Sequence, residues 1–276
     1  MRRLRLNQGV HELSRHPLSQ RVLARIADLG YAWWKLRRPG QGYAAYYVHR
    51  VSINLGLGLP HPTLGGRGWD RGSDGQRTEW DRGSFADRAR RMLPLLQGLG
   101  LREDMSCVDY GCGSLRVGQH VIGWLRPGAY LGLDVSDVFY KQGLELLDPE
   151  VVAAKQPRTA VIDAAVLDAV AAAPPDFVFC NAVVQHVPPL ELKDFFDSFL
   201  RTIGPRTTGC LLFVSAPRLR HFGSMNWAYP PQSLVAAALA SDPRLRIELR
   251  EVNSAAEDKR GRARQALLIR RGGGDD

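Results

Sequence analysis

Short apolar runs that alternate with helical stretches constrain the fold of this chain more than any other feature. Five runs of strand length lie at 106–111, 129–136, 159–163, 176–183 and 209–216, separated by 12 to 25 residues with helical periodicity. The runs are apolar on both faces, which is typical of strands buried on both sides. Buried strands joined by helical crossovers predict a parallel sheet in an α/β layer fold.

Two more strand-like segments follow near the end of the chain, LRIELREV at 245–252 and RQALLIRR at 264–271. The short segment between them is rich in Ser, Asp, Glu, Lys and Gly, which indicates a turn. We therefore expect a doubly wound, mostly parallel seven-stranded sheet that ends in a C-terminal antiparallel hairpin.

The first 83 residues have a different pattern, which predicts an N-terminal helical extension followed by a long loop. Helical periodicity runs from 11 to 37, and the segment 58–80 is rich in Gly, Pro, Asp and Arg. Long irregular loops are usually functional lids or linkers. We expect residues 1–83 to form a candidate lid and residues 84–276 to form the main domain. An amphipathic helix over 85–101, with Pro94 as a possible kink, should open that domain.

The segment VDYGCGSLRVG, at 108–118, leaves a predicted buried strand and enters a helical run. Gly111 and Gly113 allow the backbone to approach a ligand without a Cβ, and the following helix points its N–H groups into the crevice. About 20 residues later, Asp134 ends the next strand, where a carboxylate can accept both hydroxyls of a ribose. The loop and this acid together predict a nucleotide-like ligand.

The residues around the loop select among such ligands. A dinucleotide-binding loop has a third glycine where this chain has Arg116. Asp109 lies two residues before Gly111, and a carboxylate facing the crevice there would repel a pyrophosphate. It would suit a ligand that carries an ammonium and a sulfonium and no phosphate, such as S-adenosylmethionine.

With these motifs in this order, the chain resembles class I S-adenosylmethionine-dependent methyltransferases from about Ser84 to Arg271. The resemblance implies a Rossmann-like methyltransferase fold and S-adenosyl-L-methionine as cofactor, with VDYGCG at its amino-acid part, LGLDVS at its ribose, TAVIDAA near its adenine and DFVFCNAVVQHVPP beneath it. The cofactor-binding residues that it implies are Asp109, Gly111, Cys112, Gly113, Asp134, Val135, Asp163, Ala164 and Asn181.

Each remaining candidate has a functional and a structural interpretation. His186 follows the fourth strand and is either a catalytic base or a ring that caps local backbone. Asp163 either contacts the adenine or caps the next helix. Arg116 either holds a carboxylate or lies exposed in the first helical turn. Trp227 and Tyr229 are candidate walls of the substrate pocket, although aromatic side chains mostly fill cores.

An aromatic cluster in the segment GYAAYYVHRV, at 42–51, has the same two interpretations. Tyr43, Tyr46, Tyr47 and His49 either cover the substrate pocket as part of the candidate lid or pack in the core. Trp33 and Trp34, beside Arg37 and Arg38, either contact a membrane interface or anchor the N-terminal helix to the main domain.

Composition narrows the class of protein. The chain has 276 residues, 45% of them hydrophobic, and no run long enough to span a membrane. The basic N-terminus lacks the apolar core of a secretory signal, so we expect a cytoplasmic protein. The four cysteines show no metal-ligand or disulfide spacing, which predicts buried thiols and no metal site. The net charge of +9 comes almost entirely from arginine, a bias that genome composition can produce.

Three functions remain open at this point. The first is methyl transfer to an oxygen or nitrogen of a small molecule, a saccharide or a specialised metabolite. The second is methyl transfer to RNA or protein, since a positive field favours anionic partners. The third is a module that binds the cofactor without turnover. The segment CNAVVQH lacks the Pro-Pro-aromatic pattern expected for amino methylation of a nucleobase.

Overall fold

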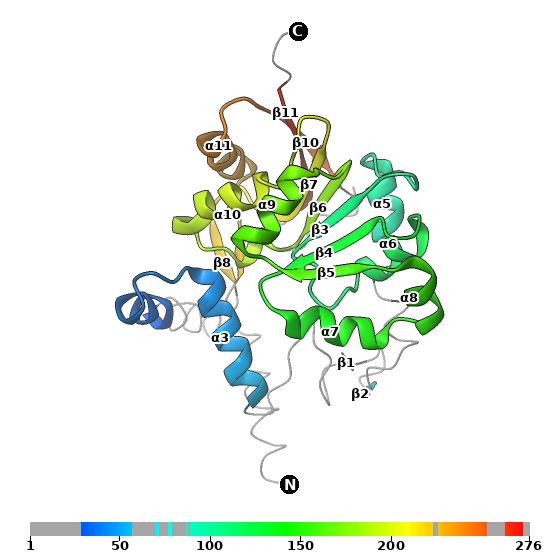
Figure 1. Ribbon diagram of the computed structural model, residues 1–276. Helices are drawn as coiled ribbons and strands as arrows, with labels where there is room; N and C mark the ends of the chain where they lie inside the picture. The colour runs from blue at the N-terminus through cyan, green and yellow to red at the C-terminus, as the bar shows by residue number, and fades with distance from the viewer. Residues whose placement is uncertain are drawn as a thin grey trace.

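The structure is a computed structural model that describes residues 29–56, 70–71, 77–78, 87, 89–222, 226–252 and 263–272. A central seven-stranded sheet organises it (Figure 1). The strands of this sheet are β3 (Cys107–Tyr110), β4 (Tyr130–Asp134), β5 (Arg158–Val161), β6 (Phe177–Asn181), β7 (Thr208–Ser215), β10 (Leu245–Glu251) and β11 (Ala263–Arg271).

The strand order is β10-β11-β7-β6-β3-β4-β5. The pairs from β7 to β5 are parallel, whereas β11 runs antiparallel to both β7 and β10. The predicted mostly parallel seven-stranded sheet with a C-terminal antiparallel hairpin is thus confirmed. The order reverses between β3 and β6, so the chain crosses from one half of the sheet to the other beside β3.

Side chains from alternate positions of the central strands enter two separate cores, because successive residues of a strand point to opposite faces. Val178 and Cys180 of β6 pack in one core, and Phe177 and Phe179 pack in the other. This arrangement explains why the runs read as continuously apolar. All four cysteines are buried and free, as expected for reduced thiols.

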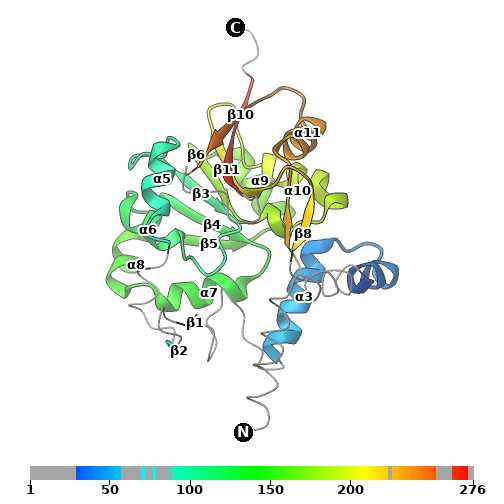
Figure 2. The same ribbon diagram turned by 180° about the vertical axis from the view of Figure 1, so that it is seen from behind.

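Helices cover both faces of the sheet (Figures 1 and 2). Side chains of α9 (Ala164–Ala172), α10 (Leu192–Leu200) and α11 (Pro231–Ser241) enter the first core. Side chains of α5 (Met92–Gly98), α6 (Gly118–Trp124), α7 (Asp137–Leu146) and α8 (Pro149–Lys155) pack against the second. Two short 3₁₀ turns, η1 (Val184–His186) and η2 (Pro189–Glu191), connect β6 to α10.

The described part of the N-terminal extension consists of a helix over residues 29–37 and the helix α3 (Tyr43–Gly56). Aromatic rings join the two: the ring centroid of Tyr31 lies 4.9 Å from that of Tyr43 and 5.2 Å from that of Tyr46. Figures 1 and 2 show α3 beside the short strand β8 (Arg220–Phe222). Residues 11–28 of the predicted helical stretch lie outside the described residues.

Three sequence expectations differ in detail from the structure. Residues 89–91 form a turn, so the helix predicted over 85–101 is described only as α5, which begins two residues before Pro94. The segment around 221–230, expected only as pocket wall, forms the hairpin strands β8 (Arg220–Phe222) and β9 (Asn226–Ala228). Of the long loop, only β1 (Asp70–Arg71) and β2 (Arg77–Thr78) are described, as an antiparallel pair.

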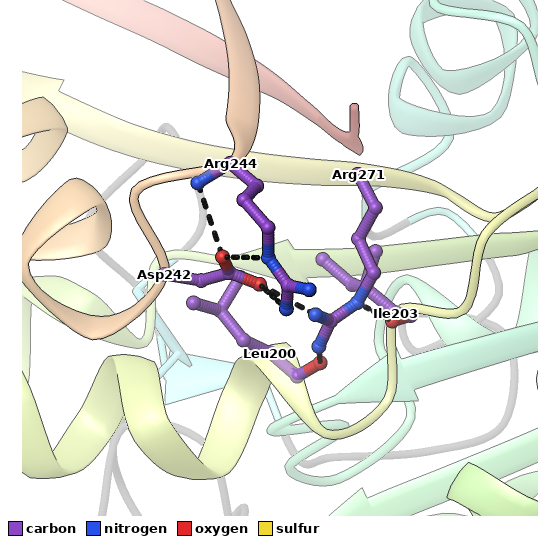
Figure 3. Close-up of polar contacts among 5 residues, drawn as sticks. All are labelled: Leu200, Ile203, Asp242, Arg244 and Arg271. Atoms are coloured by element: carbon purple, nitrogen blue, oxygen red, sulfur yellow. Dashed lines mark hydrogen bonds and ion pairs between the residues drawn. The ribbon is translucent and has the colours of Figure 1, made fainter. Parts of the chain in front are cut away.

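A partly buried ion pair fastens the last strand to the helical layer (Figure 3). The carboxylate of Asp242, after α11, accepts hydrogen bonds from the backbone and the guanidinium of Arg244. Arg271, at the end of β11, pairs with the same carboxylate and donates to the backbone oxygens of Leu200 and Ile203, at 3.1 and 2.7 Å. This clamp closes the antiparallel hairpin onto α10 and α11.

Candidate functional site

A cavity of about 820 Å³ lies at the carboxyl ends of β3, β4 and β6. Ligands of open α/β sheets bind at this edge, where the strand order reverses. The β3–α6 loop, the end of β4 and the segment from β6 to η2 form its walls on the main domain. The described part of the N-terminal extension supplies the remaining wall through Trp34, residues 41–45 and the first turns of α3.

The β3–α6 loop owes its shape to two glycines with positive φ, Gly111 at +79° and Gly113 at +54°. The backbone nitrogens of Gly111 and Cys112 both donate to the backbone oxygen of Leu133, at 2.7 and 2.9 Å, which ties the loop to β4. A Cβ added to Gly113 would meet nothing within 4 Å. Gly113 therefore presents bare backbone to open space beside the cavity.

Gly111 has a second constraint, the segment that follows β6. A Cβ at this position would lie 2.2 Å from Cγ2 of Val183. Ala182, just before it, also has a positive φ, of 62°. Two strained turns from different strands thus meet at the floor of the cavity, and glycine is the residue that fits between them.

Asp109 of β3 lies almost fully buried, with 2% of its surface exposed, and lines the cavity. Its Oδ2 accepts a hydrogen bond from the hydroxyl of Tyr130, at 2.8 Å. Burial and, to a lesser extent, the negative charge of Asp134 raise the pKa of Asp109 to about 8, against the lowering effect of the Tyr130 hydrogen bond. A cation in the cavity would relieve this cost by stabilising the ionised carboxylate.

Asp134, at the end of β4, is also buried and lines the same cavity. Its Oδ2 accepts a hydrogen bond from the backbone nitrogen of Gly113, at 2.8 Å, and its Oδ1 from that of Ser136, at 3.4 Å. Burial raises its pKa to about 6, although these backbone hydrogen bonds lower it. The two neighbouring parallel strands thus place two carboxylates at one cavity.

The helix α3 brings Tyr47 to the opposite wall. Its ring centroid lies 5.6 Å from that of His186 in η1 and 6.2 Å from that of Phe139 in α7. Burial raises the pKa of Tyr47 to about 12, and the negative charge of Asp134 contributes to the rise. Three elements far apart in sequence therefore converge on the part of the cavity that contains the candidate base.

One carboxylate, that of Glu191 in η2, connects the extension to the main domain. Its Oε2 accepts a hydrogen bond from the backbone nitrogen of Tyr43, at 2.5 Å, and its Oε1 lies 3.1 Å from Nζ of Lys35. Burial raises the pKa of Glu191, whereas the Tyr43 hydrogen bond lowers it. Both N-terminal helices are therefore held at the rim of the cavity by the same side chain.

The structure brings most of the predicted site residues together. Those that line the cavity are Asp109, Gly111, Cys112, Gly113, Arg116, Asp134, Val135, Asn181 and His186. Of the lid candidates, Tyr43, Tyr47 and His49 line it as well, whereas Tyr46 packs in the core. The side chain of Asn181 is oriented by Arg264 of β11, whose guanidinium donates a hydrogen bond to its Oδ1 at 3.1 Å.

Four predicted site residues do not line the cavity: Asp163, Ala164, Trp227 and Tyr229. The carboxylate of Asp163 accepts a hydrogen bond from the backbone nitrogen of Val166, at 2.8 Å, and so caps α9. Trp227 stacks on His221 at a centroid distance of 4.5 Å. Ala164 is the first residue of α9.

The two aromatic residues support the cavity from behind. The hydroxyl of Tyr229 donates to the backbone oxygen of Val187, which follows η1. Trp227 meets the ring of Tyr43 edge to face, at a centroid distance of 5.7 Å. They hold lining segments in place without reaching the cavity themselves.

Among the lining residues that sequence reasoning missed are Ser114, Phe139 and Glu191. The hydroxyl of Ser114 is buried and has no hydrogen-bond partner among the described residues. The position of Ser114 directly after the GCG segment could have identified it from the sequence. No sequence pattern could have identified Glu191, because its partner Tyr43 is 148 residues away.

Comparisons with known proteins give a likeness of fold. A TehB-like S-adenosylmethionine-dependent methyltransferase from Corynebacterium glutamicum shares 13% identity at a TM-score of 0.45, over 83% of this chain and 97% of that one. A methyltransferase from Mesorhizobium loti shares 13% identity at a TM-score of 0.47, over 66% of this chain and 99% of that one. The magnesium protoporphyrin IX methyltransferase from Synechocystis shares 15% identity at a TM-score of 0.47, over 68% of this chain and 79% of that one. No protein-family model and no curated protein matches the sequence.

The strand order of the sheet identifies the fold without these comparisons. When the seven strands are numbered as they occur along the chain, their spatial order across the sheet is 3-2-1-4-5-7-6. Strand 7 is antiparallel to both of its neighbours. By this topology the chain has the Rossmann-like fold of class I S-adenosylmethionine-dependent methyltransferases.

Proposed function

We propose that this protein is an S-adenosylmethionine-dependent methyltransferase that methylates an oxygen or nitrogen of a small molecule, such as a saccharide or a specialised metabolite. One observation carries the proposal. Two buried carboxylates, Asp109 and Asp134, line one cavity at the ends of adjacent parallel strands. Buried acids favour a ligand that brings its own positive charge and hydroxyl groups.

The residues of the cavity fit S-adenosylmethionine in four respects. Asp109 suits its positive charge, and Asp134 can accept hydrogen bonds from the ribose hydroxyls. The unpartnered hydroxyl of Ser114 gains a partner if the amino-acid carboxylate lies at this loop. Gly113 leaves space where a side chain would otherwise project. A pyrophosphate, in contrast, would bring negative charge toward both carboxylates.

The cofactor would supply a methyl group that is already activated on a sulfonium. The protein then has to hold the acceptor in line and, for a hydroxyl or an ammonium, remove its proton. His186 in η1 is the residue proposed for that proton, with its Nδ1 or Nε2 as the accepting atom. Tyr47, whose ring lies 5.6 Å from it, closes this side of the cavity and excludes water.

A small acceptor is favoured by the size and lining of the cavity. Its volume of about 820 Å³ lies in the range of about 300–1,000 Å³ that is typical of small-molecule sites. Tyr43 and Tyr47 of α3 and Phe139 of α7 line it with aromatic surface.

Calorimetric titration with S-adenosylhomocysteine tests the cofactor assignment. We expect the wild type to bind in the micromolar range and Asp134→Ala to lose at least about 100-fold in affinity, because hydrogen bonds to a charged group are removed in a buried site. Asp148→Ala is the control, since Asp148 is also an aspartate before a helix but caps α8 and does not line the cavity. It should bind as the wild type does.

Two results would contradict the proposal. The first is a wild type that binds neither S-adenosylhomocysteine nor S-adenosylmethionine. The second is an Asp134→Ala variant with unchanged affinity. It would show that the cofactor does not bind at the proposed site, even though it binds to the protein. If the cofactor binds, radiolabelled methyl transfer to a panel of hydroxyl and amino metabolites identifies the acceptor.

A further inference from the structure

The helix over residues 29–37 has two faces of different character. Its inner face carries Tyr31 and Trp34, which pack on α3: the ring centroid of Trp34 lies 5.7 Å from that of Tyr46 and 4.6 Å from that of His49. Trp34 also lines the cavity. The inner face therefore belongs to the candidate site, and the opposite face does not contribute to it.

The outer face carries three large apolar side chains that remain exposed. Leu29, Trp33 and Leu36 are exposed by 71%, 57% and 78%. Their spacing of four and then three residues puts them on one stripe of the helix. A contiguous apolar stripe on a surface helix marks a contact with a partner or a membrane more often than chance exposure does.

A cationic side chain borders this stripe. The guanidinium of Arg37 lies over the ring of Trp33, with its carbon 4.3 Å from the centroid. The guanidinium of Arg38 lies over Trp34 of the inner face, 3.9 Å from the centroid, and Lys35 pairs with Glu191. Residues 29–38 contain no acidic residue. Trp rings beside Arg side chains are typical of the boundary between acyl chains and headgroups.

Most of the net positive charge of the chain lies in the part of the sequence that ends with this helix. Residues 1–38 hold nine Lys and Arg against two Asp and Glu, so they carry +7 of the net charge of +9. The other 238 residues carry only +2. A composition bias would spread arginine excess along the chain, so this asymmetry points to an anionic partner for the N-terminal region.

We propose that the outer face of helix 29–37, the stripe of Leu29, Trp33 and Leu36 with its flanking arginines, docks on an anionic phospholipid surface. The helix would lie in the plane of the interface, with the stripe among the upper acyl chains and Arg37 and Arg38 at the phosphates. RNA would also attract the arginines, but it offers nothing to cover two exposed leucines. No helix among the described residues is long and apolar enough to cross a membrane.

Docking of this face has a geometric consequence for the site. Because Trp34 on the inner face lines the cavity, the wall made by the N-terminal extension would lie next to the membrane. This inference goes beyond the proposed function and does not depend on methyl transfer, since it requires only the folded chain.

Co-sedimentation of the full chain with vesicles tests the proposal. The vesicles consist of phosphatidylcholine alone or of two parts phosphatidylcholine to one part phosphatidylglycerol. We expect the wild type to partition at least about tenfold more strongly onto the anionic vesicles, since each basic residue near the surface contributes about fivefold. Raising the salt concentration should weaken the binding, because exposed charges are screened.

Substitutions separate the apolar from the electrostatic contribution. Leu36→Glu should lower partitioning onto anionic vesicles by at least about tenfold, because it removes apolar burial and adds a negative charge. Leu249→Glu, at a 46% exposed leucine of β10, is the matched control and should bind as the wild type does. Brominated lipid should quench fluorescence in the wild type and less in Trp33→Phe.

Four results would overturn the proposal. Equal, background sedimentation with both kinds of vesicle excludes a lipid surface, and binding of single-stranded RNA alone would assign the region to nucleic acid. Unchanged partitioning of Leu36→Glu would show that the stripe does not insert. A melting temperature of Leu36→Glu well below that of Leu249→Glu would show that the stripe packs within the protein instead.

Discussion

The carboxylate of Glu191 accepts a hydrogen bond from the backbone nitrogen of Tyr43, across 148 residues of sequence, at 2.5 Å. Tyr43 is the first residue of α3, so the negative charge also lies at the positive end of a helix dipole. The other carboxylate oxygen pairs with Lys35 of the preceding helix. A single side chain of η2 thus sets how the extension lies over the cavity.

Removal of this contact should loosen α3. We expect Glu191→Ala to cost about 1.5–3 kcal/mol in local stability, because a hydrogen bond to a charged group is lost. Amide hydrogen exchange over residues 43–56 should accelerate, and the KM for the acceptor should rise more than kcat falls. Glu191→Gln keeps an acceptor for Tyr43 but loses the ion pair, so its effect should be smaller.

Asp197→Ala is the control for that experiment. It removes an exposed ion pair with Lys193 on α10, whose side chains are 44% and 62% exposed. Such pairs contribute little. Equal exchange in α3 for Glu191→Ala and Asp197→Ala would show that Glu191 does not hold the helix.

The raised pKa of Asp109 predicts how stability depends on pH. The group takes up its proton at about pH 8 in the folded protein but near 3.8 when unfolded. The folded state therefore binds the extra proton between these values, and the free energy of unfolding falls as pH rises through this window, by up to about 1.4 kcal/mol per pH unit. Urea denaturation of the protein without ligand at a series of pH values measures the slope.

Asp109→Asn separates this contribution from that of other groups. Asparagine keeps an acceptor for the hydroxyl of Tyr130 and does not titrate. The pKa of Asp134 is raised only to about 6, so its contribution to the pH dependence of the free energy of unfolding ends at lower pH. Between about pH 6.5 and pH 8 the variant should lose less stability than the wild type does. Parallel curves in this interval would show that Asp109 titrates elsewhere.

His186→Asn tests the candidate base separately from binding. We expect kcat to fall by about 100-fold or more, while the affinity for S-adenosylhomocysteine stays within about twofold, because a general base acts on the acceptor and not on the cofactor. His49→Asn, at another histidine that lines the cavity, should leave kcat nearly unchanged. An unaltered kcat in His186→Asn would assign that ring a packing role against Tyr47.

Gly111 and Gly113 form a matched pair for backbone strain and steric clash. Both have positive φ, but an added Cβ meets Val183 only at Gly111. Gly111→Ala should cost about 2–5 kcal/mol in the free energy of unfolding, from strain and overpacking together. Gly113→Ala should cost only about 1–2 kcal/mol, from strain alone. Denaturant titration measures both.

A double variant checks the cause of that difference. Val183→Ala in the Gly111→Ala background removes the methyl group that a new Cβ would approach most closely, Cγ2 of Val183. It should recover part of the lost stability, even though Val183→Ala alone destabilises. Strictly additive costs would mean that the two positions do not touch in the folded protein.

Sequence periodicity determined the central sheet and its antiparallel end. Strands buried on both faces give runs such as FVFCN, and their spacing leaves room for helical crossovers between them. The loop after β3 was equally readable, because glycines at Gly111 and Gly113 and acids at Asp109 and Asp134 are local signals at fixed spacing. These parts depend on short-range pattern, which the sequence displays directly.

Only the tertiary structure decided which side chains meet across the cavity. Tyr47 lies next to His186, and Glu191 next to Tyr43, because α3 packs over η1 and η2, and no local pattern encodes that packing. It also separated two acids at strand ends that look alike in sequence: Asp134 lines the cavity, whereas Asp163 caps α9. Contacts between distant segments arise from the packing of whole elements, so residue type and spacing alone leave them open.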